Sequence, residues 1–482
     1  MFTQKPSFLS LASLAGLVWC IAATASGQLH VGAARVDITP DPAMMPPPFA
    51  SIHDHVFTRA IFIENGNASA LIMNVAVGKF TQEFYDKLSK EISSRYDIPL
   101  DNLVISAVHV HSNVPDLGAP IPGSKAGPLP ASKAYVERVY QGMIQAAGQA
   151  KASSQPAEIG FGEGQLFLNV NRDAIDPKTR QWSQEPNFAY PSDKTLAVVE
   201  FCRPNGGEPI AIYMNYAMHA NTMFLRGQIS GDFPEVASRY LEDNFDDKVV
   251  AVWSSGAAGD QNPIYRRAIN AIDEAQIKNE MDPSKADEKG GFESVAAMMR
   301  LMFGGAKRPA APLDPKLETQ SWQIVQSIGQ LMAEETLRVM DGISHFRSAP
   351  AIEGSSKSIT CPGRKRLDHA REGVSGNYED GPPTHIDVGA LRIGDIAIGR
   401  VNGEIYNKIG QEAKSGSPFQ KTIVVTLANG EADTDYIPSD DAFGRSTFEV
   451  LGSHLLPGCA EMGIVNGIDG LLNQDMEGSN LN

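Results

Sequence analysis

Two histidines separated by one residue stand at the end of an apolar run. His109 and His111 close segment 103–110, which its pattern predicts to be a β-strand. Side chains alternate across a strand, so both imidazoles are expected on the same side. Neutral imidazole nitrogens bind zinc well, and a strand fixes their separation. The pair therefore indicates a metal site, although a packed or hydrogen-bonded pair of histidines would show the same spacing.

Further strand-like segments also end next to side chains that could take part in catalysis. In open α/β sheets, sites collect beyond the carboxyl ends of the strands. These side chains are therefore expected to meet the histidine pair, although each alone also fits a structural role, such as a carboxylate at a helix start. The segments and their residues are 210–216 with His219, 249–253 with Asp260, 396–401 with Glu404, and 422–427 with Tyr436.

The alternation of strand-like and helix-like segments predicts an α/β fold, with mixed β-sheets flanked by helices in one large domain. Segments 56–64 and 70–75 are strand-like, and the Asn65-Gly66 turn between them is typical of a hairpin. The sequence shows no internal repeat. Helical spacing is found at 81–96, 234–245, 317–340 and 405–413.

Residues 266–312 interrupt this alternation. The segment is rich in charge and glycine and holds one apolar island at 296–303. It fits an insertion at the surface with one packed helix, and it also fits a lid over the substrate.

The N-terminus has the pattern of a secretory signal peptide. Lys5 precedes an apolar run at 8–23, and small residues stand at Ala23 and Ala25. Residues 1–25 are therefore predicted to be removed on export, leaving a secreted or periplasmic protein. An uncleaved membrane anchor is the alternative, but the run is shorter than the ~20 residues that span a bilayer.

The net charge and the cysteine content argue against two kinds of site, one for nucleic acid and one for thiolate-bound zinc. The net charge of -16 argues against nonspecific nucleic-acid binding, which needs a basic face. Three cysteines remain after the signal peptide, namely Cys202, Cys361 and Cys459, and none has CxxC spacing. A thiolate zinc site is therefore not expected, and at most one disulfide can form.

The order of the motifs resembles the neutral (non-lysosomal, alkaline) ceramidases. The resemblance runs from residue 31 to about residue 450, apart from 266–312, and implies a catalytic domain over 29–482. The matching motifs are His53-Asp54, His109-Val110-His111-Ser112, Gly256-Ala257-Ala258-Gly259-Asp260, Gly403-Glu404 and Asp435-Tyr436-Ile437-Pro438.

The resemblance also implies one zinc ion and its ligands. Carried over residue by residue, the ligands are His109, His219, Glu404 and Tyr436. A zinc ion in such a site activates water and polarises a carbonyl. The implied substrate is a small-molecule or lipid-like N-acyl amide, with transient contact to a membrane surface.

Four further residues are expected to act at this site. His111 is implied as an acid/base, and Arg172, in the Asn171-Arg172 element, as a group that stabilises the oxyanion; a surface arginine is the alternative. Asp260 belongs to the glycine-rich GD loop. Asn262 stands where the family has a serine, in GDVSPN. A covalent serine mechanism is therefore unavailable at this position, whereas a metal–water mechanism remains.

Two other departures leave the substrate open. The family's glycine-rich stretch after the histidine motif is absent, and the chain ends about where the catalytic domain should end, without the β-rich C-terminal domain of ceramidases that act on ceramide. Three hypotheses remain: a zinc amidohydrolase, a metal hydrolase of an ester, lactone or sugar amide, and a binding protein that kept the fold without catalysis.

Overall fold

The computed structural model describes residues 27–45, 49, 51–114, 116–117, 130–223, 227–265, 315–368 and 372–479. The predicted signal peptide, 1–25, and the expected insertion, 266–312, lie outside these residues. Within the described ranges, no helix has the length and apolar character needed to cross a bilayer.

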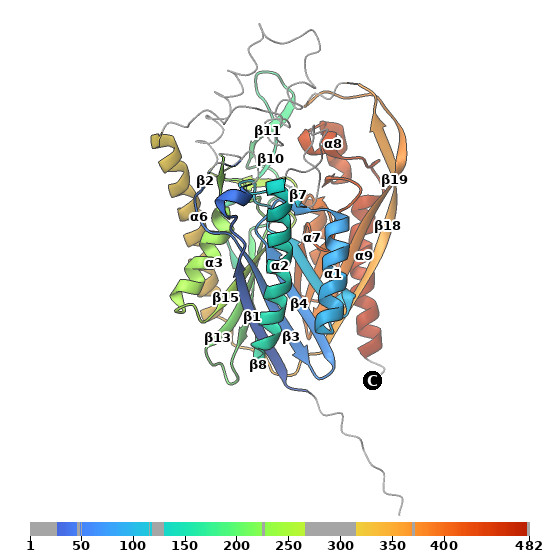
Figure 1. Cartoon of the computed structure of the whole chain (residues 1–482). Helices are drawn as coiled ribbons and strands as arrows, with labels where there is room; N and C mark the ends of the chain where they lie inside the picture. The colour runs from blue at the N-terminus through green and yellow to red at the C-terminus, as the bar shows by residue number, and fades with distance from the viewer. Residues whose placement is uncertain are drawn as a thin grey trace, which may run out of the picture.

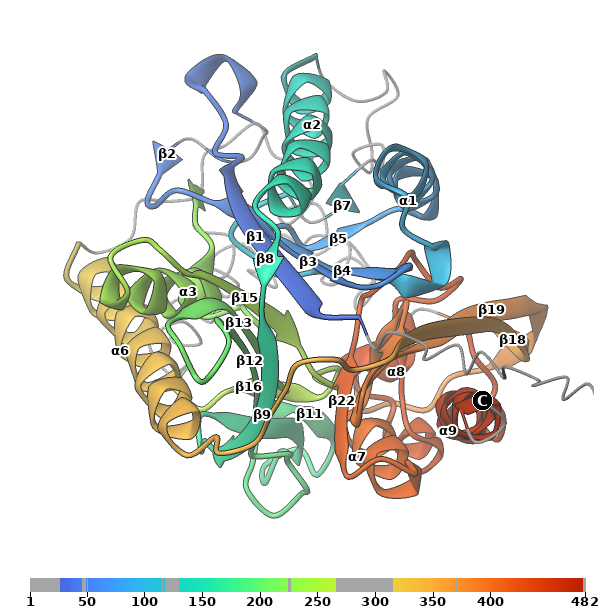
Figure 2. The same ribbon diagram turned by 90° about the horizontal axis from the view of Figure 1, so that it is seen from below.

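Three mixed β-sheets form the centre of the molecule, and each contains the same unit (Figures 1 and 2). Three antiparallel strands are followed by a helix and by a fourth strand parallel to the third. The first unit comprises β1 (Leu29–Asp37), β3 (Phe57–Asn65), β4 (Ala68–Val75), α1 (Gln82–Tyr96) and β6 (Leu103–Ala107). The second comprises β9 (Glu158–Gln165), β12 (Thr195–Cys202), β13 (Pro209–Tyr216), α3 (Asp232–Asn244) and β15 (Val250–Ser255). The third comprises β18 (Ile352–Arg366), β19 (Tyr378–Ile393), β20 (Ile396–Val401), α7 (Asn407–Gly416) and β22 (Lys421–Val425).

This repetition is one of topology, and the sequence shows no repeat that corresponds to it. Loops of different length separate the strands of the three units, so no period appears in the residues. The mixed sheets flanked by helices were predicted correctly.

The three sheets enclose one apolar core, and helices cover their outer faces. Side chains such as Ile61, Tyr213 and Ile398, one from each sheet, belong to the same buried cluster. In Figure 2 the sheets surround this centre, with the helices outside. The covering helices are α1 with α2 (Pro130–Ala152), α3 with α6 (Pro315–Asp341), and α7 with α9 (Ala460–Ser479).

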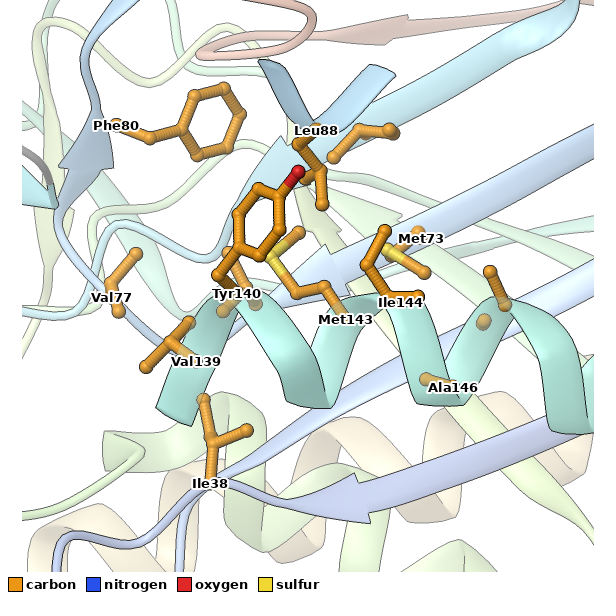
Figure 3. Packing of buried hydrophobic residues seen from close by; sticks show 14 of the residues in the cluster. Ile38, Met73, Val77, Phe80, Leu88, Val139, Tyr140, Met143, Ile144 and Ala146 are labelled. Atoms are coloured by element: carbon orange, nitrogen blue, oxygen red, sulfur yellow. The ribbon is translucent and has the colours of Figure 1, made fainter. Parts of the chain in front are cut away.

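The central strands are apolar along their length because both of their faces are buried. Residues 69–75 of β4 are all buried. On the helix side, Val139 and Met143 of α2 pack close to Met73 and Val77 of the first unit (Figure 3).

Most predicted elements are found close to their predicted limits. The helix predicted at 81–96 is α1, whose first turn is capped by the Thr81 hydroxyl accepting from the Phe84 amide. The helix predicted at 317–340 is α6. The prediction for the strand at 103–110 was wrong at its end, because the strand stops at Ala107.

One disulfide forms between Cys361 and Cys459, whose Cα atoms lie 5.7 Å apart. It ties β18 to the residue before α9, across a separation of 98 residues. Cys202 is free and buried.

Candidate metal centre

The site lies beyond the carboxyl ends of the parallel strands, where the three units meet. Gly78, His219 and Glu404 are each the third residue after the third strand of their unit, namely β4, β13 and β20. The topological repeat therefore brings equivalent positions together. Val110, between the two histidines of the first unit, forms a bridge to Ala220 of the second.

His109 and His111 converge, but not for the predicted reason. The chain has left the strand at Ala107, and His109 adopts a left-handed backbone with φ of 64°, which costs a non-glycine residue about 1–2 kcal/mol. The Nε2 atoms of His109 and His111 lie 3.3 Å apart. A turn after the strand, and not alternation along it, places the two rings side by side.

Two imidazoles and one carboxylate face one another in this site. Glu404 Oε2 lies 3.2 Å from His109 Nε2 and 3.3 Å from His219 Nε2. The far side of each ring is held by a backbone carbonyl: His109 Nδ1 donates to Gly78 O at 3.0 Å, and His219 Nδ1 donates to Gln261 O at 3.1 Å. These bonds fix the orientation of both rings, as second partners of metal-binding histidines do.

Burial and mutual contact set the charges of these groups. Burial and the nearby Arg172 lower the pKa of His219 to about 3. Burial, together with His109 and His219, lowers the pKa of His111 well below its usual value. Burial would raise the pKa of Glu404, but His109 beside it outweighs burial and holds that pKa well below its usual range. Burial opposes the charged form of His109, yet Glu404 raises its pKa.

The donor set fits a cation. His219 Nε2 and Glu404 Oε2 are both buried and have no properly formed hydrogen bond. With His219 neutral and its proton on Nδ1, two acceptors face each other with no donor between them. Neutral imidazoles plus a carboxylate are typical zinc ligands, and the ligand atoms of His109, His111 and His219 all lie within 4.8 Å of one another.

Tyr436 and Arg172 lie next to this cluster. Tyr436 is in β23 (Tyr436–Ile437), which pairs in parallel with β21 (Glu404–Ile405), so that Glu404 and Tyr436 are opposite each other. The helix predicted at 405–413, directly after Glu404, in fact begins at Asn407. Arg172 hydrogen-bonds Tyr436, and its guanidinium carbon lies 5.6 Å from the centre of that ring. Arg172 is buried, which rules out the surface-arginine alternative.

Asp260 anchors the backbone around the site. Its Oδ1 accepts from the Asn407 amide at 2.8 Å, and its Oδ2 accepts from Asn171 Nδ2 at 2.7 Å. Burial raises the pKa of Asp260 to about 6. These contacts tie the start of α7 to β10 (Asn169–Ile175), so Asp260 positions these backbone segments.

Asn262 lies in β16 (Gln261–Pro263), beside Arg172. Its Oδ1 accepts from Arg172 Nη1 at 3.3 Å and from Asn221 Nδ2 at 3.1 Å. Gly259 belongs to the same loop, and a Cβ there would lie 2.9 Å from the carbonyl oxygen of Glu404. The glycine therefore lets the loop approach the metal-ligand candidate closely.

Comparison with known proteins identifies the family of this chain. Residues 43–308 match the family described as neutral/alkaline non-lysosomal ceramidase, N-terminal. The chain belongs to this family. A solved structure described as a ceramidase complexed with C2 is similar over 94% of this chain and 76% of its own, with a TM-score of 0.65 and 14% identity. The neutral ceramidase from Pseudomonas aeruginosa is similar over 93% and 75%, with a TM-score of 0.62 and 15% identity.

Membership of the ceramidase family, together with the shared fold, supports a ceramidase-like hydrolase. The structure brings together the four predicted ligands, with His111 and Arg172 beside them, while their individual roles stay predictions. Sequence reasoning missed Glu449, which is fully buried and pairs with Arg172 Nε at 2.6 Å. The only signal for Glu449 was a carboxylate inside a short apolar segment at 448–451.

Proposed function

We propose that this chain is an exported zinc amidohydrolase that cleaves an N-acyl amide, small or lipid-like. The observation that carries the proposal is the buried contact of His109, His219 and Glu404, in which His219 Nε2 and Glu404 Oε2 have no hydrogen-bond partner. Its occurrence in a member of the ceramidase family supports amide hydrolysis. Export is supported by the N-terminal pattern and by the disulfide, since disulfides persist in oxidising compartments.

His109, His219 and Glu404, with Tyr436, would hold the zinc. When bound, zinc lowers the pKa of water and polarises the substrate carbonyl. The carbonyls of Gly78 and Gln261 keep both imidazoles aimed at the site.

Hydrolysis of the amide forms a C–O bond from water, breaks the C–N bond and moves one proton to the leaving nitrogen. His111 stands 3.3 Å from His109 Nε2, in a position to carry that proton. The buried guanidinium of Arg172 is held by Glu449 and supplies a fixed positive charge beside Tyr436. With Asn262 in place of a serine, no acyl-enzyme forms at this position and water attacks directly.

Metal content and a substrate panel test the proposal. Elemental analysis is expected to give one zinc per chain. A short-chain N-acyl amine is expected to be turned over in a chelator-sensitive way and faster than matched esters, lactones and sugar amides. A folded, metal-free protein, or chelator-sensitive turnover of esters or lactones alone, would overturn it.

Two variants separate ligands from proton carriers. His111→Ala is expected to keep the zinc and lose turnover, whereas Tyr436→Phe is expected to bind zinc more weakly. Loss of zinc from His111→Ala would place His111 among the ligands.

For export, the mass of the protein from its native compartment is expected to show removal of residues 1–25. A retained N-terminus would contradict export.

A further inference from the structure

We propose that Asn262 donates its side-chain N–H to the substrate's carbonyl oxygen, and so stabilises the charge that develops on this oxygen during hydrolysis. The inference rests on the proposed function and assigns a role to the residue that departs from the family motif.

Two groups that donate to Asn262 determine the orientation of its side-chain amide. Oδ1 accepts from Arg172 Nη1 and from Asn221 Nδ2, at 3.3 and 3.1 Å. A guanidinium has no acceptor, so only the oxygen of Asn262 can face Arg172. The amide nitrogen is therefore directed away from both partners.

The side-chain nitrogen of Asn262 remains available as a hydrogen-bond donor. Asn262 is only 6% exposed, yet its Nδ2 makes no hydrogen bond with any residue that the structure describes. Nδ2 is not among the fully buried side-chain atoms that lack a partner, so a ligand atom can reach it. Because Nδ2 can only donate, the ligand atom must be an acceptor such as a carbonyl oxygen.

Asn262 is also tied to the proposed metal site from both sides. Its neighbour Gln261 supplies the carbonyl that holds His219, and Arg172 hydrogen-bonds Tyr436. Both contacts fix the amide beside groups of the proposed metal site. Donors of this kind stabilise an oxyanion best when they are held in place before the reaction.

The amide also differs chemically from the family's serine. It cannot attack a carbonyl or lose a proton, but it can donate as a fixed dipole. The positive charge of Arg172 on its oxygen polarises the carboxamide and strengthens its N–H as a donor. The chain thus keeps a hydrogen-bond donor at this position without a nucleophile.

Asn262→Asp removes the donor, because the carboxylate still accepts from Arg172 and Asn221 while Nδ2 is replaced by oxygen. The added negative charge acts in the same direction, since it also opposes an oxyanion. Removal of one oxyanion donor is expected to lower kcat about 10²–10³-fold, with KM and zinc content close to those of the unmodified protein. Asn262→Ser, which restores a donor, is expected to be the more active of the two. Asn473→Asp makes the same chemical change on the surface of α9 and is the matched control.

A binding measurement completes the test. A phosphonate analogue of the tetrahedral adduct is expected to bind Asn262→Asp more weakly by a factor similar to the loss of kcat/KM, while binding of the carboxylate product changes less. An unchanged kcat in a zinc-loaded Asn262→Asp would refute this role and leave the proposed function standing. An inactive, zinc-free parent protein would instead refute the proposed function.

Discussion

Glu404→Gln is expected to weaken metal binding while leaving the fold intact. Glu404 Oε2 lies within 3.3 Å of both His109 and His219 Nε2, so the substitution removes the only negative charge at this contact. Tetrahedral zinc sites are worth about 10–16 kcal/mol, and a quarter of that is about 2.5–4 kcal/mol. At 1.4 kcal/mol per factor of ten, the Kd for zinc should rise about 10²–10³-fold.

Thermal unfolding at fixed zinc concentration measures this change. At zinc equal to 100 times the Kd of the unmodified protein, binding adds about 2.7 kcal/mol to its free energy of unfolding. The same concentration should add less than about 0.5 kcal/mol to the variant, because it then equals or falls below the raised Kd.

Glu461→Gln is the matched control. Glu461 and Glu404 are equally buried, with 5% exposure each, but Glu461 is held by Lys408 and the Asp440 amide, outside the site. Zinc should add the same free energy of unfolding to this control variant as to the parent protein, even if the variant unfolds at a lower temperature. If Glu404→Gln binds zinc as tightly as the parent protein, the assignment of Glu404 as a ligand is wrong.

Two further predictions concern stability. Burial raises the pKa of Glu200 to about 7. The fold therefore loses stability as the pH rises from the pKa of the unfolded state, near 4.5, through 7. After allowance for solvent screening, Glu200→Gln should be about 1–2 kcal/mol more stable than the parent protein at pH 8 and equally stable at pH 4. Denaturant unfolding at the two pH values measures this, and an equal effect at both would contradict it. Breaking the Cys361–Cys459 disulfide by a Cys361→Ser substitution should lower the free energy of unfolding by about 2–5 kcal/mol. Treating the parent protein and the variant with reductant should remove the difference between their Tm values. A variant as stable as the oxidised parent would refute a stabilising role.

The sequence determined the segments and the chemistry of the site. Apolar runs predicted the central strands because those strands are buried on both faces, and local periodicity marked α1 and α6. Histidines and a glutamate just beyond strand ends indicated a metal site, because the geometry of parallel strands brings their carboxyl ends together.

Other elements could not be predicted from local pattern. The long hairpin of β18 and β19 has strands of 15 and 16 residues with many exposed polar side chains. Their pairing depends on contacts between distant strands, which no short window records. The topological repeat was hidden for the same reason, since it lies in the order of pairing and not in similar residues.

Tertiary structure alone decided how the site residues are used. The carbonyls of Gly78 and Gln261, which orient the two imidazoles, are backbone groups and carry no sequence signal. His109 and His111 meet because the chain turns after Ala107, a left-handed step that local propensity disfavours and the surrounding contacts impose. Residue types set which atoms could bind a metal. The packing of three sheets set which atoms face one another, because that distance depends on segments far apart in the chain.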